Sequence, residues 1–158
     1  MVLERFDEDA RRRVLTVAVE EARRRGDQRV GTEHLLLALL DRPGSLGART
    51  LGVSMESART ALDDLDRQAL ASVGVDVANL PPSAGARGRR RPPLTSAARA
   101  ALKRALLEAR GSKSRRVQAR HLLLGVLACE RPDPAAELLA AVGVDPAEAR
   151  RRLAGPPP

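Results

Sequence analysis

Aromatic and sulfur-containing side chains are scarce in this chain of 158 residues. It has one phenylalanine, Phe6, no tyrosine, no tryptophan and a single cysteine, Cys129. A core without aromatic rings must be built from leucine, valine and alanine, which favours closely packed helices. One cysteine excludes an intramolecular disulfide and fits a reducing compartment.

Long apolar runs are missing as well. No run reaches the ~18 residues that a membrane-spanning helix needs, and the N-terminus lacks the basic-then-apolar pattern of a signal peptide. We therefore expect a cytoplasmic protein without a membrane partner.

Lysine is scarce too: of the 28 basic residues, only Lys103 and Lys113 are lysines. The formal net charge is +8, but an arginine excess beside abundant alanine, glycine and proline is typical of a GC-rich genome. A basic surface attracts nucleic acid or acidic partners. The lack of aromatic rings for base stacking disfavours sequence-specific nucleic-acid recognition.

Patterns that would indicate catalysis or a cofactor are absent from the sequence. It has no cysteine–histidine pair at metal-ligand spacing and no Gly-x-x-x-x-Gly-Lys-Ser/Thr phosphate loop. Cys129 ends an apolar stretch, which favours packing over reactivity. We expect no enzymatic activity, no cofactor and no metal site.

An internal repeat is what the sequence does contain. Residues 30–40 return as residues 117–127, at an offset of 87. The same offset aligns Leu15, Ala18, Glu21, Ala22 and Arg23 with Leu102, Ala105, Glu108, Ala109 and Arg110. Later in each copy the offset becomes 91, because Gly52 and Arg59 match Gly143 and Arg150. Two copies of one helical unit, packed as a pseudo-symmetric pair, are predicted.

Each copy is predicted to form four helices, so the fold is an all-α bundle of eight helices in two four-helix repeats. The first helix shows an inward stripe at residues 15, 18, 19 and 22 and ends at Gly26. Thr32 is predicted to cap a second, very apolar helix, whose counterpart follows His121. Further helix starts are predicted at Ser45, Ser54, Thr95 and Asp145.

Proline and glycine gather in residues 73–93, which predicts a linker. We divide a single domain, residues 1–158, into repeat one (6–72), the linker (73–93), repeat two (94–153) and a disordered tail (154–158). The arginine-rich run at 87–91 is either a solvated tether or a docking strip for an acidic partner or nucleic acid.

The stretch GTEHLLL at 31–37, preceded by EEAR at 20–23 and followed by LGV at 51–53, resembles the N-terminal domain of Clp/Hsp100 unfoldases, most of all the ClpC type. The resemblance runs from Phe6 to Leu153 and includes the duplication. It implies a non-catalytic domain that binds protein or peptide substrates and adaptors for a Clp unfoldase or protease. Since no ATPase module follows, we expect a free-standing domain.

The resemblance also implies that Glu33 binds the guanidinium of phosphoarginine, a mark for degradation. A carboxylate accepts a guanidinium bidentately, and a helix start with the Thr32 hydroxyl suits a phosphate. The helix dipole alone also favours glutamate in a first turn, so both explanations stay open. In repeat two, Ala119 and Arg120 replace this pair, and we predict that the second phosphoarginine site is lost. Arg120 then either holds an anion or is solvated.

Three residues complete the set of candidates. Phe6 is either a packing residue or, by resemblance, part of a hydrophobic docking surface for cyclic-peptide antibiotics. The equivalent His34 and His121 favour a polar contact at a helix start, or a hydrogen bond between the repeats, over a catalytic pair. The alternative functions are a basic interaction protein that uses the linker and a decoy for cyclic peptides that target Clp machines.

Overall fold

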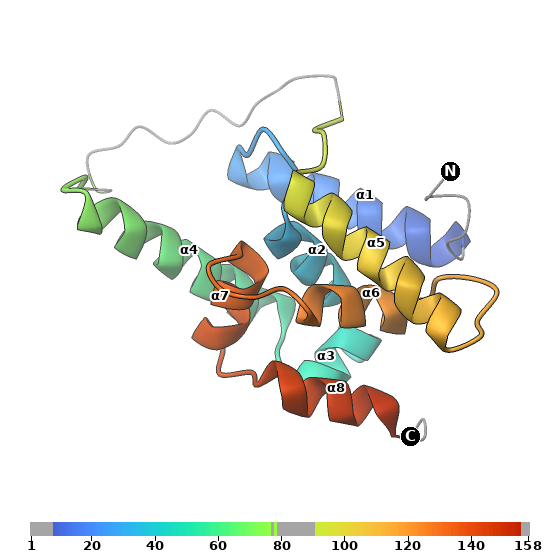
Figure 1. Cartoon of the computed structure of the whole chain (residues 1–158). Coiled ribbons are helices and arrows are strands. Elements are labelled where there is room, and N and C mark those ends of the chain that lie inside the picture. The colour runs from blue at the N-terminus through green and yellow to red at the C-terminus, as the bar shows by residue number, and fades with distance from the viewer. Residues whose placement is uncertain (1–7, 77, 79–90, 156–158) are drawn as a thin grey trace.

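The computed structural model describes residues 8–76, 78 and 91–155, and these residues form eight helices and no strand (Figure 1). The helices are α1 (Glu8–Arg25), α2 (Thr32–Leu39), α3 (Leu46–Leu51), α4 (Met55–Ser72), α5 (Ser96–Gly111), α6 (Ala119–Leu127), α7 (Pro134–Ala141) and α8 (Pro146–Ala154). The prediction of an all-α bundle of eight helices is confirmed. Helix α8 ends at the first residue of the predicted tail.

Four of the predicted helix starts are confirmed by their hydrogen bonds. A side-chain oxygen accepts a backbone N–H from the first turn of α3, α4, α5 and α8, at Ser45, Ser54, Thr95 and Asp145. Such caps satisfy N–H groups that have no partner inside the helix. Gly26, which ends α1, has a φ of 78°, a left-handed conformation that glycine adopts without steric cost.

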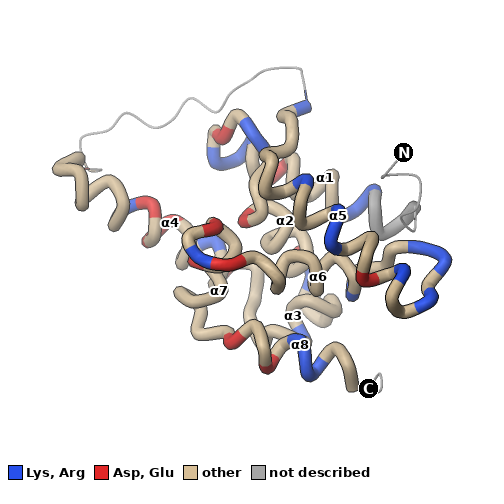
Figure 2. The backbone as a smooth tube through the Cα atoms, in the orientation of Figure 1, with Lys and Arg blue, Asp and Glu red and all other residues tan. Residues whose placement is uncertain are grey.

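Helices α2 and α6 form the centre of the core. Every residue of α2 except Glu33 is buried, and in α6 only Ala119, Arg120 and Leu124 are not. Charged residues lie mainly on the surrounding helices, as Figure 2 shows. A helix that is apolar on nearly all sides must be covered on all sides, so both repeats close around these two segments.

The third helix of each repeat packs against the other repeat. Helix α7 contacts α2 and α4 of repeat one, whereas α3 contacts α6 and α8 of repeat two, and α2 contacts α6 (Figure 1). The exchange is reciprocal, as a pseudo-two-fold relation requires. Because each short helix completes the core of the other copy, the repeats share one core.

An isolated backbone bridge adds a further tie between the copies. The Val30 N–H donates to the Pro93 carbonyl at 2.9 Å, and the Thr95 N–H donates to the Val30 carbonyl at 2.9 Å. The segment that enters α2 is thereby held beside the segment that enters α5. In the part of the chain that the structure describes, no helix combines the length and apolarity needed to cross a bilayer.

Candidate functional site

The predicted cap at Thr32 is wrong. Gly31 is the N-cap of α2, and Thr32 is its first helical residue. The Thr32 hydroxyl donates to Oδ1 of Asp133 at 2.6 Å and accepts the Ala135 N–H at 3.3 Å. Because Asp133 caps α7, the hydroxyl serves the helix start of the other repeat instead of its own.

His34 supports the start of α2 from inside the core. Its Nδ1 accepts the Gly31 N–H at 2.9 Å, and its Nε2 lies 3.0 Å from Oδ2 of Asp27. An accepting Nδ1 places the ring proton on Nε2, which therefore donates to the Asp27 carboxylate. His121 repeats the first contact in α6, where its Nδ1 accepts the Gln118 N–H at 3.0 Å. The polar contact predicted at the two helix starts is confirmed.

The Glu33 carboxylate is folded back against the start of its own helix. The side chain is 17% exposed, and its buried Oε2 atom has no hydrogen-bond partner among the described residues. Gly31 leaves room for it, because a Cβ at that position would overlap the carboxylate. Burial raises the pKa of the Glu33 carboxyl; nearby His34 and a hydrogen bond from the backbone N–H of Glu33 itself oppose this shift, and the charges of Asp27 and Asp133 add to it. Arg25 lies 3.4 Å from Asp27, but no arginine or lysine among the described residues is paired with Glu33 itself.

Asp27, Glu33 and His34 each bring one oxygen or nitrogen atom to within 4.8 Å of the others, which is close enough to surround a metal ion. Both nitrogens of His34 are committed, Nδ1 to Gly31 and Nε2 to Asp27. A metal at Nε2 would need the lone pair of that atom and would force the proton onto Nδ1, against the Gly31 N–H. The arrangement fits a cation that donates N–H bonds to carboxylates better than a metal ion.

Ala119 and Arg120 take the corresponding place in repeat two. Nη2 of Arg120 donates to the Leu153 carbonyl near the end of α8 at 3.1 Å. His121 Nε2 lies 3.0 Å from the Ser112 hydroxyl, where His34 has a carboxylate. An arginine stands where repeat one has a glutamate, and a positive charge at this point repels a guanidinium.

A family model identifies the domain type. The Clp repeat (R) N-terminal domain matches residues 5–88 and 93–156. The chain belongs to the Clp N-terminal domain family.

Full-length relatives are much longer than this Clp N-terminal domain. The chloroplast chaperone protein ClpC2 of Oryza sativa subsp. japonica is 32% identical over 155 residues, and the ClpA homolog of Cyanidium caldarium is 32% identical over 147 residues. These matches cover 96% and 91% of the chain but only 15% of each relative.

Solved structures of related domains share the fold. The N-terminal domain of ClpD from Arabidopsis thaliana superposes with a TM-score of 0.70 at 24% identity, covering 98% of both chains. The N-terminal domain of the ClpV1 ATPase from E. coli superposes with a TM-score of 0.53 at 22% identity, covering 95% of this chain and 84% of that one.

Two site residues of this Clp N-terminal domain escaped prediction. Asp133 lies 101 residues from Thr32 in sequence, so no local pattern links them. Asp27 had only its place after the helix-ending Gly26 as a signal.

Other candidates lie apart from Glu33. Burial raises the pKa of the Cys129 thiol to about 11, so the thiol stays protonated at neutral pH, as expected for a packing residue. Phe6 and linker residues 79–90 lie outside the described residues, and their roles stay predictions.

Proposed function

We propose that this domain is a non-catalytic module that receives marked proteins for a Clp unfoldase, and that Glu33 binds the guanidinium of phosphoarginine on them. Domains of this family generally bind substrates and adaptors. The relatives are a chaperone and an ATP-binding subunit of a Clp protease. Delivery of proteins to such a machine, and thereby regulation of proteolysis, extends this role to the present chain.

The buried Oε2 atom of Glu33 carries the proposal. It has no hydrogen-bond partner among the described residues, and Asp27 and Asp133 add negative charge around it. An unsatisfied buried acceptor costs about 1–3 kcal/mol. A guanidinium presents its N–H donors in a planar fork that matches a carboxylate. Because Oε2 is buried, the Glu33 side chain must turn outward to accept both donors, and this pairing removes the cost.

The phosphate group of the ligand requires hydrogen-bond donors, which these carboxylates do not supply. The Thr32 hydroxyl is held by Asp133 and Ala135, so it meets a phosphate only if it releases them. A phosphate would otherwise face solvent, away from Asp27 and Asp133, because like charges repel. The guanidinium is therefore the anchoring group of the proposed ligand.

Calorimetric titration with free phosphoarginine and with free arginine tests the proposal. Glu33→Gln keeps the shape of the side chain and removes its charge. Glu56→Gln is a matched control, because Glu56 also lies in the first turn of a helix, α4. We expect phosphoarginine to bind at one site and to lose its binding in Glu33→Gln only, while free arginine measures what the guanidinium contributes without the phosphate.

Two results would contradict the proposal. Equal affinity for arginine and phosphoarginine would show that the site binds a guanidinium without recognising the phosphate. Absence of binding for both ligands in the wild-type protein would rule out Glu33 as a receptor site.

A further inference from the structure

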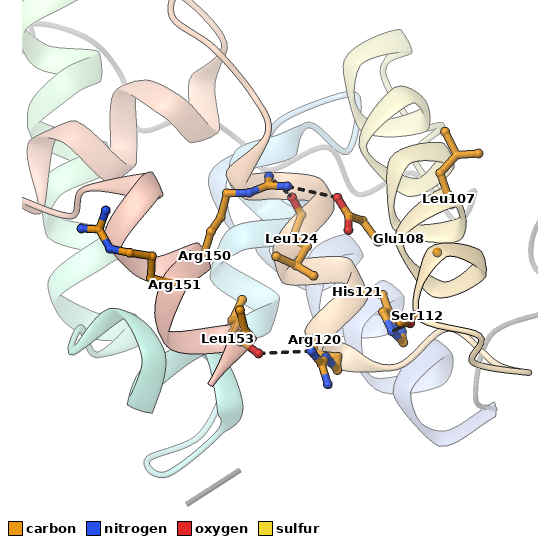
Figure 3. A pocket seen from close by; sticks show the side chains of 11 residues that line it. Leu107, Glu108, Ser112, Arg120, His121, Leu124, Arg150, Arg151 and Leu153 are labelled. Atoms are coloured by element: carbon orange, nitrogen blue, oxygen red, sulfur yellow. Dashed lines mark hydrogen bonds and ion pairs between the residues drawn. The ribbon is translucent and has the colours of Figure 1, made fainter. Parts of the chain in front are cut away.

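Repeat two contains a cavity that repeat one closes with a charged side chain. The cavity has a volume of about 560 Å³ and lies between α5, α6 and α8 (Figure 3). Its wall includes Leu124, Leu153, Ser112, Arg120 and Arg150. This volume lies within the usual range for small-ligand sites.

The internal repeat explains why the cavity is open here. Ser112 and Ala154 of repeat two correspond to Arg25 and Asp63 of repeat one, at offsets of 87 and 91. The Arg25 guanidinium spans from α1 to α4, where it pairs with Asp63 at 2.5 Å and with Asp66. Only 9% of the Arg25 side chain is exposed, so it occupies the gap whose counterpart in repeat two holds a serine and an alanine.

The charges along the cavity leave one arginine for a ligand. Arg150 pairs with Glu108 at 3.1 Å, and Arg151 pairs with Glu148. Arg120 has no carboxylate partner among the described residues; its one hydrogen bond there goes to the Leu153 carbonyl. Its remaining N–H donors are therefore available to an anion beside Leu124 and Leu153.

Only a singly charged anion fits this balance. Glu108 borders the cavity and is paired with Arg150, so Arg120 carries the one positive charge of the lining that no carboxylate among the described residues offsets. Burial lowers the pKa of His121, and the adjacent Arg120 lowers it further, so His121 is neutral at pH 7 and adds no cation. A carboxylate that carries an apolar group satisfies one guanidinium and covers the partly exposed Leu124 beside the buried Leu153, whereas a phosphate dianion does not.

We propose that this cavity binds the C-terminal residue of a polypeptide that ends in an apolar side chain. The α-carboxylate pairs with Arg120, and the apolar side chain packs on Leu124 and Leu153. This second site is separate from Glu33 and takes the opposite charge. The domain then has two unlike receptors, one for a guanidinium and one for a chain terminus.

Fluorescence anisotropy with the full chain tests the proposal, using fluorescein-labelled Gly-Ala-Leu as the free acid and as the C-terminal amide. We expect the acid to bind at least about tenfold more tightly than the amide, because the amide lacks the charge-assisted pair. Arg120→Ala should reduce binding of the acid to the level of the amide. Arg99→Ala is the matched control, since Arg99 also donates to a backbone carbonyl, that of Leu94 at 3.2 Å, away from the cavity.

A second pair of variants guards against a loss of binding through misfolding. Ala154→Asp places a carboxylate at the cavity as Asp63 does in repeat one, and should abolish binding of the acid. Ala154→Asn has the same size without the charge and should bind the acid. Glu33→Gln should also bind it, which separates this site from the proposed phosphoarginine site.

Three outcomes would overturn the proposal. These are equal binding of acid and amide, unchanged binding of the acid to Arg120→Ala, and displacement of the peptide by inorganic phosphate more readily than by acetate. The last result would assign the cavity to phosphoryl ligands.

Discussion

Repeat one and repeat two place an ion pair at the same point, but bury it differently. Glu21 and Arg59 are 2.5 Å apart and Glu108 and Arg150 are 3.1 Å apart. The Glu21 side chain is 5% exposed, whereas that of Glu108 is 35% exposed. Burial alone would raise the pKa of Glu21, but its hydrogen bond from Arg59 and the charge of Arg24 outweigh burial and leave the pKa lowered. The same pair is therefore worth more in repeat one.

The gap between the first and fourth helices of each repeat shows the same trend. In repeat one the Arg25 side chain crosses it to Asp63 and Asp66, and in repeat two Ser112 leaves a cavity. The third and fourth helices of both repeats begin with a side-chain cap, and the second helix of both is buried, whereas the polar residues between the first and fourth helices differ. Between its first and fourth helices, repeat one therefore has a network of ion pairs, whereas repeat two has a cavity.

The largest expected loss of stability comes from substitutions in the core that the two repeats share. Leu36 and Leu123 are equivalent and are 1% and 0% exposed. Replacing either by alanine should cost about 2–5 kcal/mol, and both variants should unfold in one transition because α2 and α6 share a core. Urea unfolding followed by circular dichroism measures this. A variant that melts in two steps would show that the repeats fold independently.

The ion pairs provide the next contrast. Arg59→Ala should cost about 1–2 kcal/mol, because Glu21 is left buried while solvent screens the partly exposed Arg59. Arg150→Ala should cost less than about 0.5 kcal/mol. Thermal unfolding at several pH values gives both differences. Since the pKa of Glu21 is lowered on folding, its contribution is present above the unfolded pKa of about 4.3 and is lost as pH falls through the folded pKa. Equal costs at pH 7 would contradict the comparison.

Glu33→Gln should stabilise the domain by about 1 kcal/mol at pH 7, although most single substitutions in a protein lower its stability. The pKa of Glu33 is raised on folding, so its ionised form opposes folding above the unfolded pKa. The gain should disappear below about pH 4, where the carboxyl is neutral in both states. Thermal melts of wild type and variant at pH 7 and pH 4 measure it. A loss of stability at pH 7 would mean that the carboxylate has a partner.

Gly31→Ala should change stability least, by less than about 0.5 kcal/mol, because a Cβ displaces only the mobile end of the Glu33 side chain. The displaced carboxylate should gain solvent, so its pKa should fall back toward the usual value. Titration of the Glu33 side-chain carbon by NMR follows this shift. An unchanged pKa would show that Gly31 does not hold the carboxylate in place.

The helix boundaries followed from local chemistry and were predictable. Ser54 and Thr95 cap the helices expected of them, since a hydroxyl bonds to N–H groups within the next turn. The same rule predicted a cap at Thr32, but its hydroxyl donates instead to the Asp133 carboxylate of the other repeat at 2.6 Å. Capping patterns consider only residues that are close in sequence. They therefore miss a charged partner that the packing of the helices places nearby.

The sequence predicted Glu33 as a site residue, but it did not predict that its carboxylate is buried. Glu33 followed from resemblance, but the position of its carboxylate depends on the missing side chain at Gly31, and its raised pKa depends on burial and on the charges of Asp27 and Asp133. The loss of the second glutamate at Arg120 was visible in the sequence. The cavity beside Arg120 was not, because it depends on how α5, α6 and α8 come together.

The duplication can be read directly from the repeated residues. The apolar central helices and most caps follow from the sequence as well, because periodicity and capping act within a few residues. Which charges are buried, which ion pairs form and where a cavity remains follow only from the packing of the helices. These depend on side chains that lie far apart in the sequence, 38 residues for Arg25 and Asp63 and 101 for Thr32 and Asp133. They also depend on burial, which sets the energy of each charge only after the core has closed.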